Sequence, residues 1–374
     1  MKVEVLQSSF KAGLSAVSRV VSSKPNLPIL GNILISANKD HLILAATDLD
    51  VGMKLKLKAK VIEEGSICVP SRIFVDFISS ISSDKVLLKS EETILKAESE
   101  TYKSSFNCLD SKEFPSFPQR KGEAMLSFSK SAFTKGLAKV LFSTSTDTSR
   151  QILNGVLFEF EKKGVKLIST DGFRLSSQSL QGDFSVKEKL VIPARGLQEV
   201  IKIGDIDLEE KGEEEIKIFV SENEGQLIIE SRETEIVLRL LEGSFPNYKR
   251  IIPSEFESEI KVSREELLQA VKVASIFARD NANIINLSLD LKTKKMSISA
   301  QSREIGEGFT TIDVEGEGNS LELSFNSRFL LESLSVFSLS DIALQFSGSL
   351  KPVIIKEVED KSFFHVLMPV KTGS

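Results

Sequence analysis

The sequence is poor in the residues that most often carry chemistry. Its 374 residues include only two cysteines, Cys68 and Cys108, and two histidines, His41 and His365, which lie far apart. Two cysteines are too few for a disulfide framework and fit a reducing compartment, so we expect a cytoplasmic protein. No cysteine or histidine has metal-ligand spacing, and we expect neither a metal nor a cofactor.

Several motifs and one kind of segment are also missing. The chain has no Walker phosphate loop, no dinucleotide fingerprint and no nucleophile elbow. No apolar run approaches the ~20 residues of a membrane span. The segment from Met1 to Phe10 is polar and mixed, so we expect no signal peptide. Because 41% of the residues are hydrophobic and 27% are charged, the composition is that of an ordinary globular protein.

An internal repeat is the strongest positive signal. One constant offset places Phe10 on Phe133, Thr47-Asp48 on Thr170-Asp171, and Pro70 on Pro193, with Arg72 on Arg195. A third, more divergent copy follows, in which Leu287 takes a strand position and Asn326 takes the place of Pro193. Each copy reads as a strand, a helix, a strand hairpin, a second helix and further strands. We therefore predict three α+β units of antiparallel sheet with two helices each, spanning residues 1–121, 122–253 and 254–374.

The distribution of charge gives two interpretations. A net charge of −5 argues against a conventional basic DNA-binding domain. Yet basic residues gather on the predicted helices, while much of the acid lies in turns and strands; the helix residues are Lys11, Arg19, Arg72, Lys130, Lys135, Lys139, Arg195, Lys202, Arg264, Lys272 and Arg328. Such a face would attract phosphates without reading bases. The alternative is that these are ordinary solvated helix faces.

A hydrolase or lyase is the alternative from another class. Asp48, Asp171 and His365 are the residues with which it would have to work. Both aspartates follow a predicted strand, where aspartate is more often a turn residue. No base–nucleophile motif accompanies them, which counts against an enzyme.

Five segments together resemble the bacterial DNA polymerase III β subunit family, the β sliding clamps. They are Pro25 to Asn32, Thr170 to Leu175, Val191 to Pro193, Glu242 to Tyr248, and Val366 to Val370. The resemblance covers essentially the whole chain. It implies a non-catalytic DNA replication factor that encircles duplex DNA and makes a polymerase processive. It also implies three similar domains per chain, and two chains joined head to tail in a closed ring. A specialised paralogue in the same fold remains an alternative.

The resemblance also implies particular binding residues. A groove between the second and third domains would take short peptides from the replicative polymerase α subunit, the clamp loader and other proteins that carry a clamp-binding motif. Its residues would be Leu153, Thr170, Gly172, Phe173, Arg174, Leu175, Pro246, Arg250, Ile251, Asn326, Phe329, Leu350, Pro352, Val366, Met368, Pro369, Val370 and Lys371. Lys24, Arg72 and Arg150 would lie near DNA, and Ile276 and Phe277 would lie at the contact between subunits.

Some of these positions carry alternatives. Arg174 and Arg250 could hold the backbone or a carboxylate of the peptide, although a local ion pair is the alternative for Arg174. Ile276 and Phe277 could equally be helix core. Phe173 stands where the family often has histidine, which makes the groove more apolar. Lys371 stands where many members have arginine, and it lacks the bidentate geometry of a guanidinium.

Overall fold

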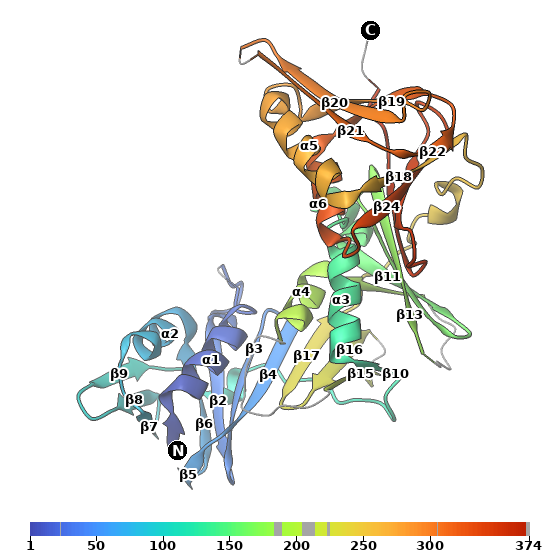
Figure 1. The fold of residues 1–374 in the computed structure, drawn as a ribbon. Helices are drawn as coiled ribbons and strands as arrows, with labels where there is room; N and C mark the ends of the chain where they lie inside the picture. The colour runs from blue at the N-terminus through green and yellow to red at the C-terminus, as the bar shows by residue number, and fades with distance from the viewer. Residues whose placement is uncertain (23, 183–188, 204–213, 223–224, 305, 372–374) are drawn as a thin grey trace. The chain divides into compact units, whose positions relative to one another are not determined.

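The computed structural model describes residues 1–22, 24–182, 189–203, 214–222, 225–304 and 306–371. They fall into two compact units, one formed by residues 1–134 and 195–240 and the other by residues 135–194 and 241–374 (Figure 1). Every strand pairing in the four sheets is antiparallel, and each repeat contributes two helices. The predicted α+β class is therefore confirmed. In the described part of the chain, no helix has the length and apolar character needed to cross a membrane.

The first unit contains two sheets. One has the order β5-β1-β7-β8-β9, with β1 Lys2–Leu6, β5 Lys60–Glu63, β7 Lys85–Glu91, β8 Ile94–Glu98 and β9 Lys103–Asn107. The other has the order β10-β15-β16-β17-β4-β3-β2-β6, with β2 Asn32–Asn38, β3 His41–Thr47, β4 Val51–Lys58, β6 Gly65–Pro70, β10 Leu126–Ser129, β15 Glu215–Val220, β16 Gln226–Ser231 and β17 Thr234–Arg239. The second sheet joins strands of the first and second repeats through β4 and β17.

The second unit repeats this plan. Its larger sheet has the order β14-β11-β12-β13-β26-β25-β24-β18-β22, with β11 Gly155–Glu161, β12 Gly164–Thr170, β13 Arg174–Gln181, β14 Lys189–Pro193, β18 Ser258–Ser263, β22 Glu315–Gly318, β24 Asp341–Phe346, β25 Val353–Glu357 and β26 Phe363–Leu367. Its smaller sheet has the order β21-β20-β19-β23, with β19 Ile284–Asp290, β20 Lys295–Ser302, β21 Gly306–Asp313 and β23 Leu321–Asn326. Here β13 and β26 join the second and third repeats.

The helices bury the apolar faces that the sequence predicts. They are α1 Gln7–Ser18, α2 Ser71–Ser80, α3 Lys130–Leu141, α4 Ala194–Lys202, α5 Arg264–Ala278 and α6 Ser327–Val336. Phe10, Leu14 and Val17 on α1 are all buried, as the spacing predicts. Ser263 caps the N-terminus of α5, where its hydroxyl accepts from the backbone N–H of Glu266 at 3.3 Å.

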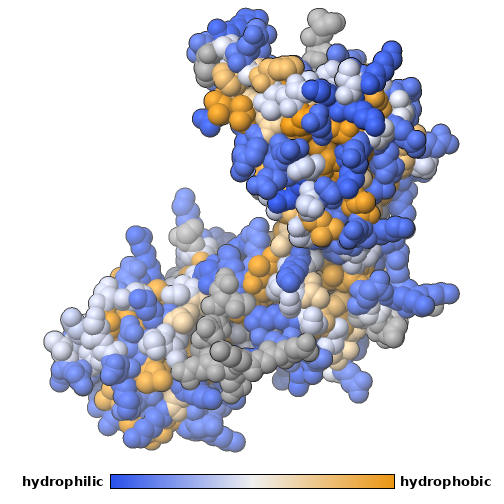
Figure 2. Space-filling model, in the orientation of Figure 1, coloured by the Kyte–Doolittle hydropathy of each residue, from blue (hydrophilic) through white to orange (hydrophobic). Residues whose placement is uncertain are grey.

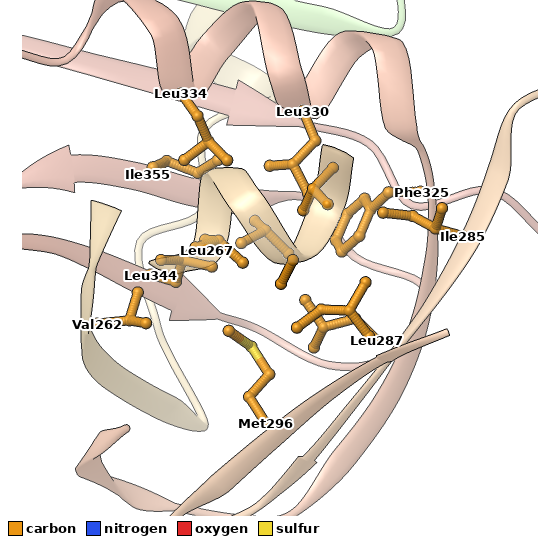
Figure 3. Close-up of a cluster of buried hydrophobic side chains, with 14 of the residues drawn as sticks. Val262, Leu267, Ile285, Leu287, Met296, Phe325, Leu330, Leu334, Leu344 and Ile355 are labelled. Carbon is orange, nitrogen blue, oxygen red and sulfur yellow. The ribbon is translucent and has the colours of Figure 1, made fainter. Parts of the chain in front are cut away.

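The helix pairs of the first and third repeats pack against sheet. α1 and α2 pack side by side, with α1 on β3 and β4, and α5 and α6 pack side by side, with α5 on β19, β20 and β21 (Figure 1). Figure 3 shows the core under α5 and α6, where Leu267, Met296, Phe325 and Leu330 converge. Burying one such side chain contributes about 1.5–3 kcal/mol, so these contacts hold the helices on the sheets.

Turns after β3 and β12 confirm the repeat at atomic detail. The Asp48 carboxylate accepts from the backbone N–H of Val51 at 2.8 Å, and Asp171 accepts from that of Arg174 at 3.0 Å. The hydroxyl of Thr47 donates to the Val51 carbonyl, and that of Thr170 donates to the Arg174 carbonyl. Both aspartates therefore serve a turn, which leaves the enzyme alternative without its acids.

Candidate functional site

The pairing of β13 with β26 brings together residues that are far apart in the sequence. Arg174 lies opposite Leu367, and Leu175 lies opposite Val366. Just beyond the paired residues, the backbone N–H of Met368 donates to the Phe173 carbonyl at 3.0 Å. The turn that carries Thr170, Gly172 and Phe173 is thus tied to the C-terminal segment. Gly172 has a φ of +95°, a conformation that glycine adopts without strain.

Arg174 is anchored on every nitrogen of its guanidinium group. Its Nε donates to Asp171 at 3.0 Å, one Nη donates to Glu332 at 2.5 Å, and the other donates to the Phe142 carbonyl at 2.7 Å. The group lies 5.2 Å from the Phe142 ring centroid and 4.4 Å from that of Phe329. Since only 7% of Arg174 is exposed, its donors are used inside the protein. Arg174 therefore forms local ion pairs with Asp171 and Glu332, and its role at the predicted groove stays a prediction.

Aromatic and aliphatic side chains form the exposed part of the site. The Phe173 ring stacks on that of Phe329 with centroids 6.4 Å apart, and 64% of Phe173 remains exposed. Leu350 is also 64% exposed. Pro352, Met368, Pro369 and Val370 are half-buried, and Lys371 and Arg250 are exposed. An exposed aromatic beside a flexible thioether suits apolar anchor residues from several partners.

Most of the other predicted residues are buried or half-buried, whereas Pro246 is exposed. Leu153, Leu175 and Val366 are buried, and the last two share one apolar cluster with Tyr248. Ile251 is half-buried. The carbonyl of Pro246 accepts from the backbone N–H of Tyr248 at 2.7 Å. Asn326 caps α6, where its side chain accepts from the backbone N–H of Arg328 at 3.0 Å. These residues shape and support the surface.

A buried polar chain runs under the same strands. The hydroxyl of Ser176 lies 2.9 Å from His365 Nδ1 and 2.7 Å from the Ser143 hydroxyl. Within the described part of the chain, His365 Nε2 has no hydrogen-bond partner. Burial, followed by the nearby Arg174 cation, lowers the pKa of His365 to about 3. The imidazole is therefore neutral at pH 7.

Glu159 of β11 ties the segment around Tyr248 to the neighbouring strand β14. Its carboxylate accepts from the Tyr248 hydroxyl and from the ammonium groups of Lys189 and Lys249, at 2.8 and 3.1 Å for the two lysines. Burial alone raises the pKa of Glu159, but the bonds from Lys189, Tyr248 and Lys249 outweigh it and hold the pKa near 2. The arrangement fixes the segment that contains Pro246.

Some important residues were not predicted. Glu332 and Phe142 orient Arg174, although neither belongs to the predicted groove. The repeat aligns Glu332 with Glu199, which accepts from Arg19 at 2.6 Å, but Arg19 is not the repeat counterpart of Arg174, so the repeat does not predict the Arg174 pair. Phe142 acts through its backbone carbonyl and its ring, and nothing in the sequence indicates that role.

The residues expected near DNA or at a subunit contact are found on surfaces. Lys24, Arg72 and Arg150 are exposed, the first two in the first unit and the third in the second. Ile276 is exposed on α5, whereas Phe277 is half-buried and covers Gly308 of β21. Figure 2 shows a face on which hydrophilic side chains dominate and apolar ones form smaller groups.

Several basic helix residues turn out to be paired. Arg19 and Lys202 both contact Glu199, Lys130 contacts Glu214, and Arg195 contacts Asp48. In the second unit, Lys139 contacts Glu357, and Arg328 contacts Glu332. Ion pairing reduces the positive charge that these residues offer to phosphates, so the basic faces are weaker than the sequence suggests.

Comparison with known proteins gives consistent matches over the whole chain. Models of the DNA polymerase III beta subunit match with its N-terminal domain at residues 1–118, its central domain at 127–247 and its C-terminal domain at 249–371. The beta sliding clamp of Synechococcus elongatus is 29% identical over 380 residues, which is 100% of both chains. That of Staphylococcus aureus is 28% identical over 384 residues, again 100% of both. The crystal structure of the DNA polymerase sliding clamp from Bacillus subtilis has a TM-score of 0.92 at 25% identity and 100% coverage of both chains.

Proposed function

The chain belongs to the bacterial DNA polymerase III β subunit family, the β sliding clamps, and from this premise we propose that two copies close head to tail around duplex DNA. The protein is a DNA sliding clamp and not an enzyme. We place its three domains at residues 1–121, 122–253 and 254–374. The observation that supports the ring is that one kind of strand pairing, here called a junction, occurs twice within the chain. At each junction, a strand of one repeat pairs with a strand of the next.

The two junctions within the chain leave one pair of strands unused. β4 of the first repeat pairs with β17 of the second, and β13 of the second pairs with β26 of the third. The counterparts at the ends of the chain are β21 and β9, and both are edge strands. Exposed edges offer unpaired N–H and C=O groups to another strand. Pairing β21 of one copy with β9 of another, twice, closes a ring with two-fold symmetry.

Strand registers specify how the third junction would form. Val51 begins β4 and lies opposite Leu238, and Arg174 begins β13 and lies opposite Leu367. Gly306 begins β21 and so takes the place of Val51 and Arg174. Phe106 of β9 takes the place that Leu238 holds in β17. The same register therefore places Phe106 opposite Gly306 of the next copy, and Ser105 opposite Glu307.

Apolar groups on the helix side favour the same contact. The Phe106 ring lies 5.1 Å from Phe74 and 5.3 Å from Phe77, so it points towards the helices. On β21, a Cβ at Gly308 would lie 2.5 Å from the Phe277 ring, which places that ring on the helix side as well. With Ile276, these aromatics would form the apolar centre of the subunit contact.

A closed ring holds DNA by topology and needs only loose contact with phosphates. We propose that Lys24, Arg72 and Arg150 supply such contacts, which weaken as salt rises. This mode of binding is compatible with a net charge of −5, since the positive charge need only lie on the inner surface. It carries no base sequence preference.

The partners would be held at the surface around Phe173, Phe329, Leu350 and Met368. We propose that the polymerase α subunit, the clamp loader and other proteins dock there through short apolar motifs. A partner tethered beside DNA rebinds at a high effective concentration, which makes synthesis processive. We place this work in the cytoplasm.

Retention on DNA tests the proposal. Protein loaded by a clamp loader onto nicked circular DNA should stay bound through gel filtration in high salt. After the circle is cut once, the protein should slide off. Equal loss from circular and linear DNA would contradict the ring.

A further inference from the structure

A hollow opens in the first unit beside the junction of β4 and β17. Its walls include Thr47, Leu49, Asp50, Pro115, Phe117 and Val237, and it is small and open to solvent. All of these residues belong to the first unit, so the hollow is formed within one body.

The hollow is the repeat counterpart of the surface around Phe173. Because Val51–Leu238 and Arg174–Leu367 are equivalent pairs, Val237 corresponds to Val366 and Asp50 to Phe173. The hollow therefore lies at the same place beside the β4–β17 junction as the proposed groove does beside the β13–β26 junction. Thr47 and Pro115 fit this equivalence, since Thr47 makes the same turn bonds as Thr170 and Pro115 follows Phe114 as Pro246 follows Phe245.

The chemistry of the two sites differs. The stacked aromatics Phe173 and Phe329 have Asp50 and Gly196 as their counterparts. A Cβ at Gly196 would lie 2.1 Å from a methyl carbon of Leu238, so this part of the first junction is already filled. Asp50 is exposed, and in the described residues its carboxylate makes no ion pair. The neighbouring Asp48 is paired with Arg195.

Leu49 adds an exposed apolar side chain at the mouth. It has a φ of +79°, where its counterpart Gly172 has +95°, and 49% of it is exposed. A left-handed conformation costs a non-glycine residue roughly 1–2 kcal/mol. Because the Leu49 side chain is exposed, its contacts with the rest of the fold offset little of this cost. Backbone strain of this kind is often found where a ligand binds.

We propose that this hollow binds an extended peptide segment of a partner protein in which an aliphatic residue stands beside lysine or arginine. The aliphatic residue would pack on Leu49, Pro115 and Phe117, and the cation would pair with Asp50. That the ligand is a peptide rests on the proposed function of the groove, whereas the shape and charge of the hollow do not. The basic residue distinguishes this ligand from the apolar motifs proposed for the Phe173 surface.

Methyl NMR on the full-length protein tests this inference. The probes are acetyl-Leu-Arg-Leu-Pro-amide and its matched control acetyl-Leu-Glu-Leu-Pro-amide, titrated into protein with labelled leucine and valine methyl groups. The arginine peptide should shift Leu49 and Val237 in a saturable way, and the glutamate peptide should bind there at least fivefold more weakly. Asp50→Asn should weaken the arginine peptide about fivefold, while Asp76→Asn, at an exposed acid on α2, should not.

The two sites report separately. No saturable shift at Leu49 and Val237, or equal affinity in the Asp50→Asn and Asp76→Asn variants, overturns the inference. Shifts confined to Leu350 and Val366 would also overturn it while leaving the proposed groove intact. If a polymerase-derived peptide failed to shift Leu350 and Val366, the proposed groove would fail on its own, whatever happened at Leu49.

Discussion

The guanidinium of Arg174 lies 4.4 Å from the centroid of the Phe329 ring and is bonded to Glu332 on the same helix. One residue of β13 thereby sets the position of an aromatic on α6. Because each of its three nitrogens already donates to a protein acceptor, we expect its role to be the positioning of the predicted groove.

Removing Arg174 should therefore destabilise the second unit. Arg174→Ala leaves the Asp171 and Glu332 carboxylates without their buried partner, and we expect a loss of about 3 kcal/mol in the free energy of unfolding. Arg174→Lys should not restore it, because one ammonium cannot reproduce the planar contacts. Chemical denaturation measures both. Arg328→Ala is the control, since Arg328 contacts the same Glu332 from the surface and should cost less than about 1 kcal/mol. Equal losses for the Arg174→Ala and Arg328→Ala variants would refute the positioning role.

Charge at the exposed groove should disrupt partner binding. Met368→Glu would oblige an apolar anchor to lie beside a carboxylate, and we expect binding of a polymerase-derived peptide to weaken at least tenfold, or about 1.4 kcal/mol. Fluorescence anisotropy measures the affinity. Val358→Glu changes another exposed apolar residue of the same unit and serves as the matched control. Wild-type affinity in the Met368→Glu variant would remove Met368 from the site.

Stability should fall as the pH drops below 6.5, because of His365. The pKa of its imidazole is about 3 in the fold and about 6.5 when the chain is unfolded. Below 6.5 the unfolded chain binds a proton that the fold excludes, so stability declines by up to about 1.4 kcal/mol per pH unit until the folded pKa is reached. Calorimetry between pH 7 and 5 avoids most carboxylate titration. His365→Gln, which can still bond Ser176, should flatten the slope, and an unchanged slope would contradict this account.

The register proposed for the subunit contact can be tested by cross-linking. Ser105→Cys combined with Glu307→Cys should give a disulfide-linked dimer on mild oxidation, because opposed strand residues have Cα atoms about 4.5–5.5 Å apart. Ser105→Cys with Asp313→Cys is the control, since Asp313 lies six residues further along β21. The native Cys68 and Cys108 are buried. Cross-linking of the control pair at an equal rate would reject the register.

The sequence predicted the helix faces and the fold class from local periodicity, and the repeat from one constant offset between matching residues. Phe10, Leu14 and Val17 share a face whatever the rest of the chain does. The ion pairs of Arg19 with Glu199 and of Arg174 with Glu332 depend on packing between distant segments, so periodicity gives no sign of them. For the same reason the sequence suggested basic helix faces where the structure pairs several of the charges. The groove residues came from resemblance, and their roles as core, cap or exposed surface became visible only in three dimensions.

The mass of the protein in solution tests the central claim most directly. Sedimentation equilibrium over a wide concentration range should give twice the chain mass of 41.3 kDa. Phe277→Asp, which places a charge at the proposed subunit contact, should shift the protein towards the monomer, whereas Val358→Glu should not. A strict monomer at all concentrations, or a dimer that Phe277→Asp leaves unchanged, would contradict ring closure through β9 and β21.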